Sequence, residues 1–257
     1  WEVSRFLWAV KFAQSYIITG DKFYLDSLNE WLSDWSENNP INQGPNWKCG
    51  QETSFRLIYL LLTIFFLKEK ADAQPILEKM ISEHCLRIFS TKEYAQAQNN
   101  NHSVSEAAGM YLGSSYLIKN GNSDNKIIKI NQHSIGLLES AIENLISSDG
   151  SFSQYSTNYH RLLIDILSLV AFFNNEFNLE KLSTNFYDKA SKAIYWLWSI
   201  TDDSSGVAPN IGANDGSYLL NLTKSDYNDF RPSIQLASVI INGKRLYESK
   251  DEDEILS

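Results

Sequence analysis

A polar run in the middle of the chain places groups capable of chemistry at the start of an otherwise apolar segment. It contains Asn100, Asn101 and His102, and Glu106 follows His102 by four residues. On a helix, side chains four residues apart share a face, so this imidazole and carboxylate can bond each other or one ligand. The run also fits an ordinary helix start, because asparagine is a good N-cap and its neighbours can be solvated.

A second polar run, residues 154–161, opens another strongly apolar segment. Tyr159, His160 and Arg161 are its candidates for moving a proton and for binding acidic groups. The run also fits a simple amphipathic first turn, in which Tyr159 is half-buried and Arg161 pairs with Asp165 four residues later.

A third cluster combines Asn46 and Trp47 with Glu52 and Arg56. Glu52 and Arg56 are four residues apart, so they share a helical face and could act on one ligand. The structural alternative is an intrahelical ion pair, worth a few tenths of a kcal/mol.

Together, the three clusters would supply a tyrosine, two histidines, two arginines and several amides. This set suits removal of a proton beside a carboxylate, as at C5 of a uronic acid. Amides and imidazoles can hydrogen-bond the carboxylate and stabilise the developing charge, and tyrosine or histidine can move the proton. Because helix N-termini also favour anions, we expect the first two clusters to share one concave surface with Arg56 or Trp47.

Other chemistries lack their sequence signatures. The four histidines, at positions 84, 102, 133 and 160, offer no His-x-x-x-His pair for zinc. No nucleophile elbow, phosphate loop or dinucleotide fingerprint occurs, so we expect neither a metal nor a cofactor. Paired carboxylates for glycoside hydrolysis stay open, since 31 acidic residues leave many candidates.

Composition limits the fold and the partners. With 257 residues, 43% of them hydrophobic, the chain can bury one large core. The net charge of −9 disfavours nucleic acid or an anionic membrane as partner. The apolar run at 57–67 is too short to span a bilayer, so it predicts a buried helix. The two cysteines, Cys49 and Cys85, could be free or bridged.

Apolar residues recur at three- and four-residue spacing through most of the chain, which predicts an all-α protein. Turn-forming clusters of Gly, Asn, Ser and Pro separate the segments, so we expect antiparallel helical hairpins. Such hairpins can close into an α/α toroid or stack into an open solenoid. The predicted helices are 2–19, 22–37, 50–69, 72–91, 102–119, 124–147, 156–175, 182–199 and 231–242, followed by an acidic tail.

Five motifs occur in a fixed order over most of residues 1–220, and together they are more specific than any one alone. They are Trp31 and Trp35 with Asn39-Pro40, the cluster of Asn46-Trp47 with Glu52 and Arg56, Asn-Asn-His-x-x-x-Glu-Ala at 100–107, Asp-Gly-Ser-Phe at 149–152 followed by the run 154–161, and Pro-Asn-Ile-Gly-Ala-Asn-Asp-Gly at 209–216. This order and spacing resemble the heparinase II/III family of polysaccharide lyases.

The resemblance implies an incomplete α/α toroid over residues 1–220. Residues 221–257 would then be a final helix and an acidic tail that lead toward a C-terminal β-sandwich domain of the same polypeptide. The chain starts at Trp1 without an initiator methionine or signal peptide, so we expect it to be part of a longer bacterial protein, periplasmic or secreted. The family cleaves uronic-acid-containing polysaccharides by β-elimination and leaves a 4,5-unsaturated sugar, which makes an acidic polysaccharide the expected substrate.

By that likeness, Asn101 or Asn100 would neutralise the uronate carboxylate with support from His102 and Glu106, and Tyr159 would act as base or acid. The remaining substrate contacts would come from Trp47, Glu52, Arg56, His160, Arg161, Asn210 and Asp215.

Two departures from the family pattern bear on activity. The loop 212–216 reads Gly-Ala-Asn-Asp-Gly, so one acidic position is replaced. The family also takes a catalytic histidine from the β-sandwich domain, and we expect this sequence to stop before that domain. The competing hypothesis is therefore a non-catalytic helical scaffold that binds a glycan.

Overall fold

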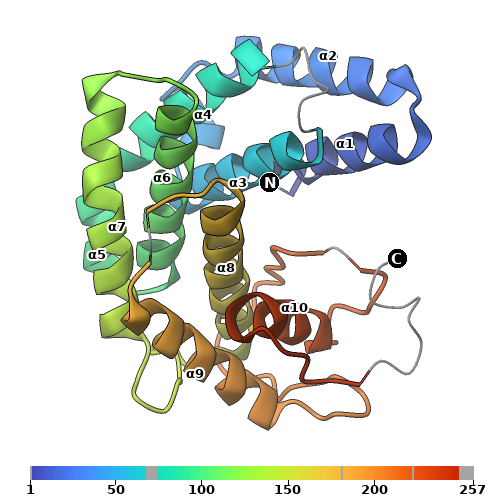
Figure 1. Cartoon of the computed structure of the whole chain (residues 1–257), viewed down its shortest axis with the longest axis vertical. Helices are drawn as coiled ribbons and strands as arrows, with labels where there is room; N and C mark the ends of the chain where they lie inside the picture. Colours follow the sequence, from blue (N-terminus) through green and yellow to red (C-terminus); the bar gives the residue numbers. More distant parts are fainter. Residues whose placement is uncertain (1, 68–73, 181, 222, 249–257) are drawn as a thin grey trace. The chain divides into compact units, whose positions relative to one another are not determined.

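The computed structural model describes residues 2–67, 74–180, 182–221 and 223–248 (Figure 1). Within these ranges the regular structure is helical, and strand-type pairing is limited to isolated bridges that join Ile146 to Phe152 and Val207 to Asp229. The predicted all-α class is therefore confirmed. The residues group into two compact units, one from 1–97 and 105–136 and one from 98–104 and 137–257, so far as these ranges are described.

The first unit is built around α3, which is buried along most of its length because it packs against both α1 and α4. Its residues are apolar on nearly all sides, as expected for a helix with neighbours around it. In Figure 1, α1 and α2 form a hairpin that turns at Gly20. The elements are η1 (Glu2–Arg5), α1 (Leu7–Thr19), α2 (Lys22–Asn38), η2 (Pro45–Trp47), α3 (Gly50–Leu67), α4 (Gln74–Phe89), α5 (Lys92–Gln98), most of α6 (Asn101–Lys119) and the first half of α7 (Asn125–Leu145).

The second unit centres on α8 (Thr157–Glu176), against which α9 (Thr184–Ile200) and α10 (Arg231–Asn242) pack. The end of α7 joins α9 through Glu143, whose side chain accepts a hydrogen bond from Asn185, and through Lys189, which donates to the Ile146 carbonyl. Because α10 packs on α8 and α9, it belongs to this unit. The domain boundary expected at residue 220 stays a prediction.

The predicted helices match those of the structure with three exceptions, one of which is the short 3-10 helix η2, which was not predicted. The segment 2–19 is divided at Phe6, whose φ of 72° ends the short 3-10 helix before α1 begins. Helix α5 was not predicted, because seven residues with little apolar spacing carry almost no periodic signal. Parts of the segments 50–69 and 72–91, and most of the acidic tail, lie outside the described residues.

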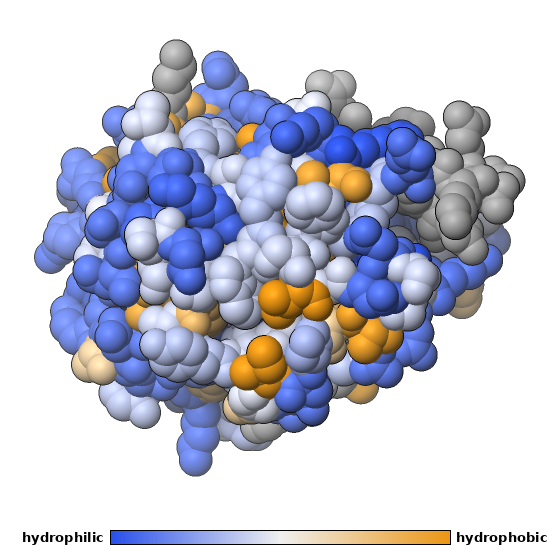
Figure 2. Space-filling view, turned by 90° about the horizontal axis from the view of Figure 1, so that it is seen from below, coloured by the Kyte–Doolittle hydropathy of each residue, from blue (hydrophilic) through white to orange (hydrophobic). Residues whose placement is uncertain are grey.

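No helix in the described ranges is long and apolar enough to cross a bilayer. The apolar run at 57–67 is largely buried inside the first unit, as predicted. The face drawn in Figure 2 is mostly hydrophilic, and its hydrophobic residues are scattered in small groups. Such isolated groups are normal on a protein surface.

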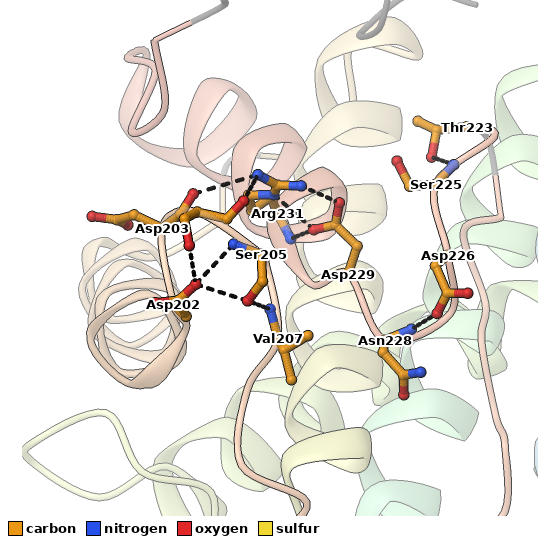
Figure 3. Close-up of polar contacts among 11 residues, drawn as sticks. Asp202, Asp203, Ser205, Val207, Thr223, Ser225, Asp226, Asn228, Asp229 and Arg231 are labelled. Atoms are coloured by element: carbon orange, nitrogen blue, oxygen red, sulfur yellow. Dashed lines mark hydrogen bonds and ion pairs between the residues drawn. The ribbon is translucent and has the colours of Figure 1, made fainter.

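The segment between α9 and α10 is held by side chains rather than by regular structure (Figure 3). Arg231 donates through Nη2 to Asp229 Oδ2 at 2.8 Å and through Nη1 to the Ser204 carbonyl at 3.1 Å. Asp202 accepts hydrogen bonds from the hydroxyls of Ser204 and Ser205, which lower its pKa to about 2. The start of α10 is therefore tied to the turn that follows α9.

Helix α6 approaches α3 closely through a glycine. A Cβ built on Gly109 would lie 2.9 Å from Ser54 Cβ and 3.2 Å from Ser54 Cα. These atoms belong to the backbone of α3 or are attached directly to it, so they cannot move without shifting the helix. Gly136, in α7, has no atom within 4 Å of such a Cβ.

Gly109→Ala is expected to lower the free energy of unfolding by about 1–2 kcal/mol, because overpacking of about 1–3 kcal/mol exceeds the gain in helix propensity. Gly136→Ala is the matched control and should raise it by about 0.5–1 kcal/mol, since it adds propensity without a clash. Urea unfolding followed by circular dichroism measures both. Equal effects of the two substitutions would contradict the close approach of α6 to α3.

Candidate functional site

The first turn of α6 is closed by amide side chains from two places in the sequence. The His102 backbone N–H donates to Asn100 Oδ1 at 2.9 Å, so Asn100 acts as an N-cap. The Asn101 backbone N–H donates to Gln154 Oε1 at 3.1 Å. Asn101 is buried and His102 is half-buried. Gln154 thus joins the backbone of Asn101 to the polar run that leads into α8.

The start of α8 is capped by Ser156, whose Oγ accepts from the Tyr159 backbone N–H at 3.1 Å. The same hydroxyl donates to the Ala213 carbonyl. The Thr157 backbone N–H donates to the Ile211 carbonyl at 3.1 Å. The motif at 209–216 therefore folds over the N-terminus of α8. A Cβ at Gly212 would lie 2.0 Å from the Tyr155 carbonyl oxygen, so this position requires glycine.

The Tyr159 hydroxyl donates to Asp215 Oδ2 at 3.0 Å. The other carboxylate oxygen, Oδ1, accepts from the Ser217 backbone N–H at 3.0 Å and from Asn158 Nδ2 at 3.3 Å. Partial burial, the hydrogen bond to Asp215 and the charge of that carboxylate raise the pKa of Tyr159 to about 12. Tyr159 therefore carries its proton at neutral pH.

Arg161 is buried behind this pair and holds the segment that precedes α10. Its Nη1 donates to the Tyr227 carbonyl at 2.6 Å and its Nη2 to Asn158 Oδ1 at 3.2 Å. The guanidinium lies 4.3–4.4 Å from the ring centroids of Tyr218, Tyr227 and Phe230. Protein groups surround this side chain in the structure, and the predicted contact of Arg161 with acidic substrate groups stays a prediction.

His160 is also buried. Its Nε2 lies 2.8 Å from the Ala193 carbonyl, and its ring stacks on Trp196 at 4.6 Å. Burial lowers the pKa of His160 to about 4, so the neutral ring donates Nε2–H to that carbonyl. In this structure the ring joins α8 to α9, and the predicted substrate contact of His160 stays a prediction. Asn210, by contrast, is exposed and accepts from Asn214 Nδ2 at 3.0 Å.

In the first unit, Arg56 is fully buried. Its Nε donates to His84 Nε2 at 3.1 Å, and its guanidinium lies 5.3 Å from the Trp35 ring and 5.4 Å from the Trp47 ring. Burial lowers the pKa of Arg56 to about 10. Because His84 Nε2 accepts, its proton is on Nδ1, which faces the Met80 carbonyl. Arg56 and Trp47 therefore build the core of this unit.

Glu52 pairs with Arg5 through two hydrogen bonds of 2.7 Å, so the intrahelical pair with Arg56 is replaced by a longer-range one. Glu106 is buried, and its carboxylate lies against the Gly50 backbone at the start of α3. Both cysteines are free.

The sequence pattern of the family described as "Heparinase II/III N-terminus" matches residues 1–230. The chain belongs to the heparinase II/III family. The resemblance seen in the five motifs is thereby confirmed.

Named relatives of this heparinase II/III chain are lyases. It is 23% identical over 205 residues to the heparin-sulfate lyase of Bacteroides thetaiotaomicron. This match covers 75% of this chain and 28% of that protein. The structure of heparinase III matches with a TM-score of 0.68 at 20% identity, over 92% of this chain and 36% of that one. The heparan sulfate lyase HepC from Pedobacter heparinus matches with a TM-score of 0.58 at 22% identity, over 81% and 33%.

The structural matches show that the heparinase II/III chain has the predicted toroid-type helical fold of heparinase III. The chain spans about a third or less of the length of these relatives.

The predicted site residues fall into both units. Asn101, His102, Tyr159 and Asp215 lie in the second, where the links through Gln154 and Ser156 bring their segments together. The four predicted residues Trp47, Glu52, Arg56 and Glu106 lie in the first. A surface shared by the two groups stays a prediction. Among the described residues, no group of three or more histidine, cysteine or acidic side chains is arranged to hold a metal ion.

Sequence reasoning missed two residues of the Tyr159 network. Asn158 lies in the polar run, but an amide at a helix start is more simply solvated. Tyr227, whose hydroxyl lies 2.8 Å from Asn158 Oδ1 and 2.6 Å from Asn214 Oδ1, belongs to no motif. Tyr227 is identified only by its contacts in the structure. Its ring and carbonyl contact Arg161 of α8, and its hydroxyl contacts Asn158 and the 209–216 loop.

Asp165, one turn after Arg161, is fully buried, and neither carboxylate oxygen has a hydrogen-bond partner in the described part of the chain. Burial raises the pKa of Asp165 to about 7. This shift is opposed by the positive charge of Arg161 and by two nearby groups, the Ser233 hydroxyl and the Leu220 backbone. Neither of these two groups reaches normal hydrogen-bond geometry with the carboxylate. The alternative of a direct ion pair with Arg161 does not describe the structure.

The folded-state pKa of Asp165 lies above its ordinary value of 3.8, so its contribution to stability is present below about pH 4 and is lost as pH rises through 7. Asp165→Asn removes this titration. The stability of the variant relative to wild type should therefore increase with pH, by up to about 1.4 kcal/mol per pH unit between pH 4 and 7. Urea unfolding at several pH values measures the difference, and parallel curves would contradict the assignment.

Proposed function

We propose that this chain is the helical part of a polysaccharide lyase that cleaves a uronic-acid-containing glycan by β-elimination. Tyr159 would transfer the proton, and Asn101 with His102 would neutralise the uronate carboxylate. Membership of a family whose named relatives are heparin and heparan sulfate lyases supports the reaction class.

The exposure of Tyr159 carries the proposal. Residues 156–171 are buried with the single exception of Tyr159, which is partly exposed. The start of α8 thus presents one phenol to solvent, while the side chains around it are packed inside the unit. The Asp215 carboxylate fixes the hydroxyl of that phenol. Tyrosine is a competent proton-transfer group when it is placed within reach of the substrate.

The position of Asn101 and His102 at the N-terminus of α6 supports their proposed role in neutralising the uronate carboxylate. Asn101 and His102 stand in the first turn, where the helix dipole favours an anion such as a uronate carboxylate. The bond from the Asn101 backbone to Gln154 links this turn to the segment that carries Tyr159. An amide or imidazole hydrogen-bonded to the carboxylate would stabilise the charge that forms when the C5 proton leaves.

The substrate class follows as a proposal from the names of the relatives: a heparan-type uronate glycan. Such a polymer is met outside the cytoplasm, so we also propose a periplasmic or secreted location. A β-sandwich domain of the same polypeptide would supply the further histidine. The acid/base set proposed for this chain is then one part of the whole enzyme.

Tyr159→Phe should lower kcat by about 10²–10⁴, because it removes one acid/base group, while glycan affinity changes little. Tyr155→Phe is the matched control: it removes a hydroxyl four residues earlier from a side chain that is 76% exposed, and it should leave kcat unchanged. The natural polypeptide that contains this chain is assayed on heparan sulfate, heparin and unsulfated polyuronides by ultraviolet absorbance of the unsaturated product. Glycan binding without product in the wild type would favour the scaffold hypothesis.

A further inference from the structure

The Asp215 carboxylate is fixed from three sides. Its Oδ1 accepts the Ser217 N–H and the Asn158 amide, and its Oδ2 accepts the Tyr159 hydroxyl. Asn158 is itself held by Arg161 and Tyr227. The likeness to the family implied a substrate contact for Asp215. In the structure its oxygens are engaged by protein groups, although the residue is exposed to solvent.

This arrangement matters for proton transfer by Tyr159. With a pKa of about 12, the phenol is ionised in only about one molecule in 10⁵ at pH 7. A preformed phenolate is therefore a poor explanation for a base at this position. A phenol can still accept a proton if its own proton leaves at the same time, which requires an acceptor on its far side. Asp215 Oδ2, 3.0 Å away, is such an acceptor.

We propose that Asp215 is a positioning residue that orients the Tyr159 hydroxyl and takes its proton during the reaction. The inference rests on the proposed lyase function. Because the hydroxyl proton points at Asp215, the oxygen lone pairs are directed away from the carboxylate and are free to accept a proton.

The proton balance closes within this pair and the substrate. The C5–H bond breaks and its proton bonds to Tyr159 Oη, while the Tyr159 proton moves to Asp215 Oδ2. The electron pair left at C5 forms the C4–C5 double bond, and the C4–O4 bond breaks. Asp215 then returns its proton to Tyr159, whose hydroxyl protonates the departing O4. The net result is the transfer of one proton from C5 to O4.

Asp215→Asn tests the role, since the amide keeps the size of the side chain but cannot take up the proton. We expect kcat to fall by about 10²–10⁴. We also expect the Tyr159 pKa to move from about 12 toward its ordinary value of 10, because an adjacent negative charge is removed. Asp215→Glu restores the carboxylate and should recover part of the activity even if Asp215→Asn is unstable.

Asp226→Asn is the matched control. This carboxylate is exposed in the same unit, and its contact is the Asn228 backbone N–H (Figure 3). The control should leave both kcat and the Tyr159 pKa unchanged. The pKa is measured by NMR titration of tyrosine labelled with ¹³C at Cζ, with the signal assigned by Tyr159→Phe.

The outcomes separate the two proposals. If Tyr159→Phe abolishes cleavage while Asp215→Asn keeps the wild-type kcat and pH profile, the role of Asp215 is overturned and the lyase function stands. A Tyr159 pKa that does not fall in Asp215→Asn also overturns it, independently of any activity. If the wild-type polypeptide cleaves no uronate glycan, the lyase function fails and the proton transfer fails with it.

Discussion

The attachment of the segment 209–217 to the first turn of α8 is the interaction on which the rest of the second unit depends. A helix start exposes backbone N–H groups that need acceptors. Here Ser156 and the Ile211 carbonyl supply them, and both come from irregular chain. The hydrogen bonds between these segments join residues 52–57 positions apart. The start of α8 and the loop therefore form together, and the orientation of the Tyr159 phenol is a product of that joint structure.

Each unit also contains a buried arginine surrounded by aromatic rings. Arg56 lies between Trp35 and Trp47, and Arg161 lies among Tyr218, Tyr227 and Phe230. Removing such a charge from water is costly, and the planar guanidinium recovers part of that cost by stacking and by donating to carbonyl groups. Both side chains connect segments far apart in sequence.

The sequence predicted the helices well because apolar periodicity is a local property. It also identified the polar runs at 98–102 and 154–161, since polar side chains at the start of an apolar helix stand out. It did not show which way the side chains face. Arg56, His160 and Arg161 were expected to contact substrate, and all three are buried. Their partners, such as His84, Ala193 and Tyr227, lie 28–66 residues away, and no spacing rule connects them.

The partner of Tyr159 shows the same limit. Asp215 was found as part of a motif, but its hydrogen bond to a phenol 56 residues earlier is a tertiary contact. Gly212 shows how a motif position can be explained afterwards. A side chain there would collide with the Tyr155 carbonyl, so the glycine is a requirement of packing.

The long connection between α9 and α10 affects the order in which parts of the second unit unfold on heating. Its described residues, 201–221 and 223–230, have no regular hydrogen-bond ladder. Each ordered residue costs about 1–2 kcal/mol of backbone entropy. The Arg231 contacts with Asp229 and the Ser204 carbonyl are among the hydrogen bonds that oppose that entropy. Segments of this kind open locally at free energies below that of global unfolding. Heat would therefore separate Asp215 from Tyr159 while α9 and the later turns of α8 are still folded, so the contact proposed for proton transfer is lost before most of the helical content.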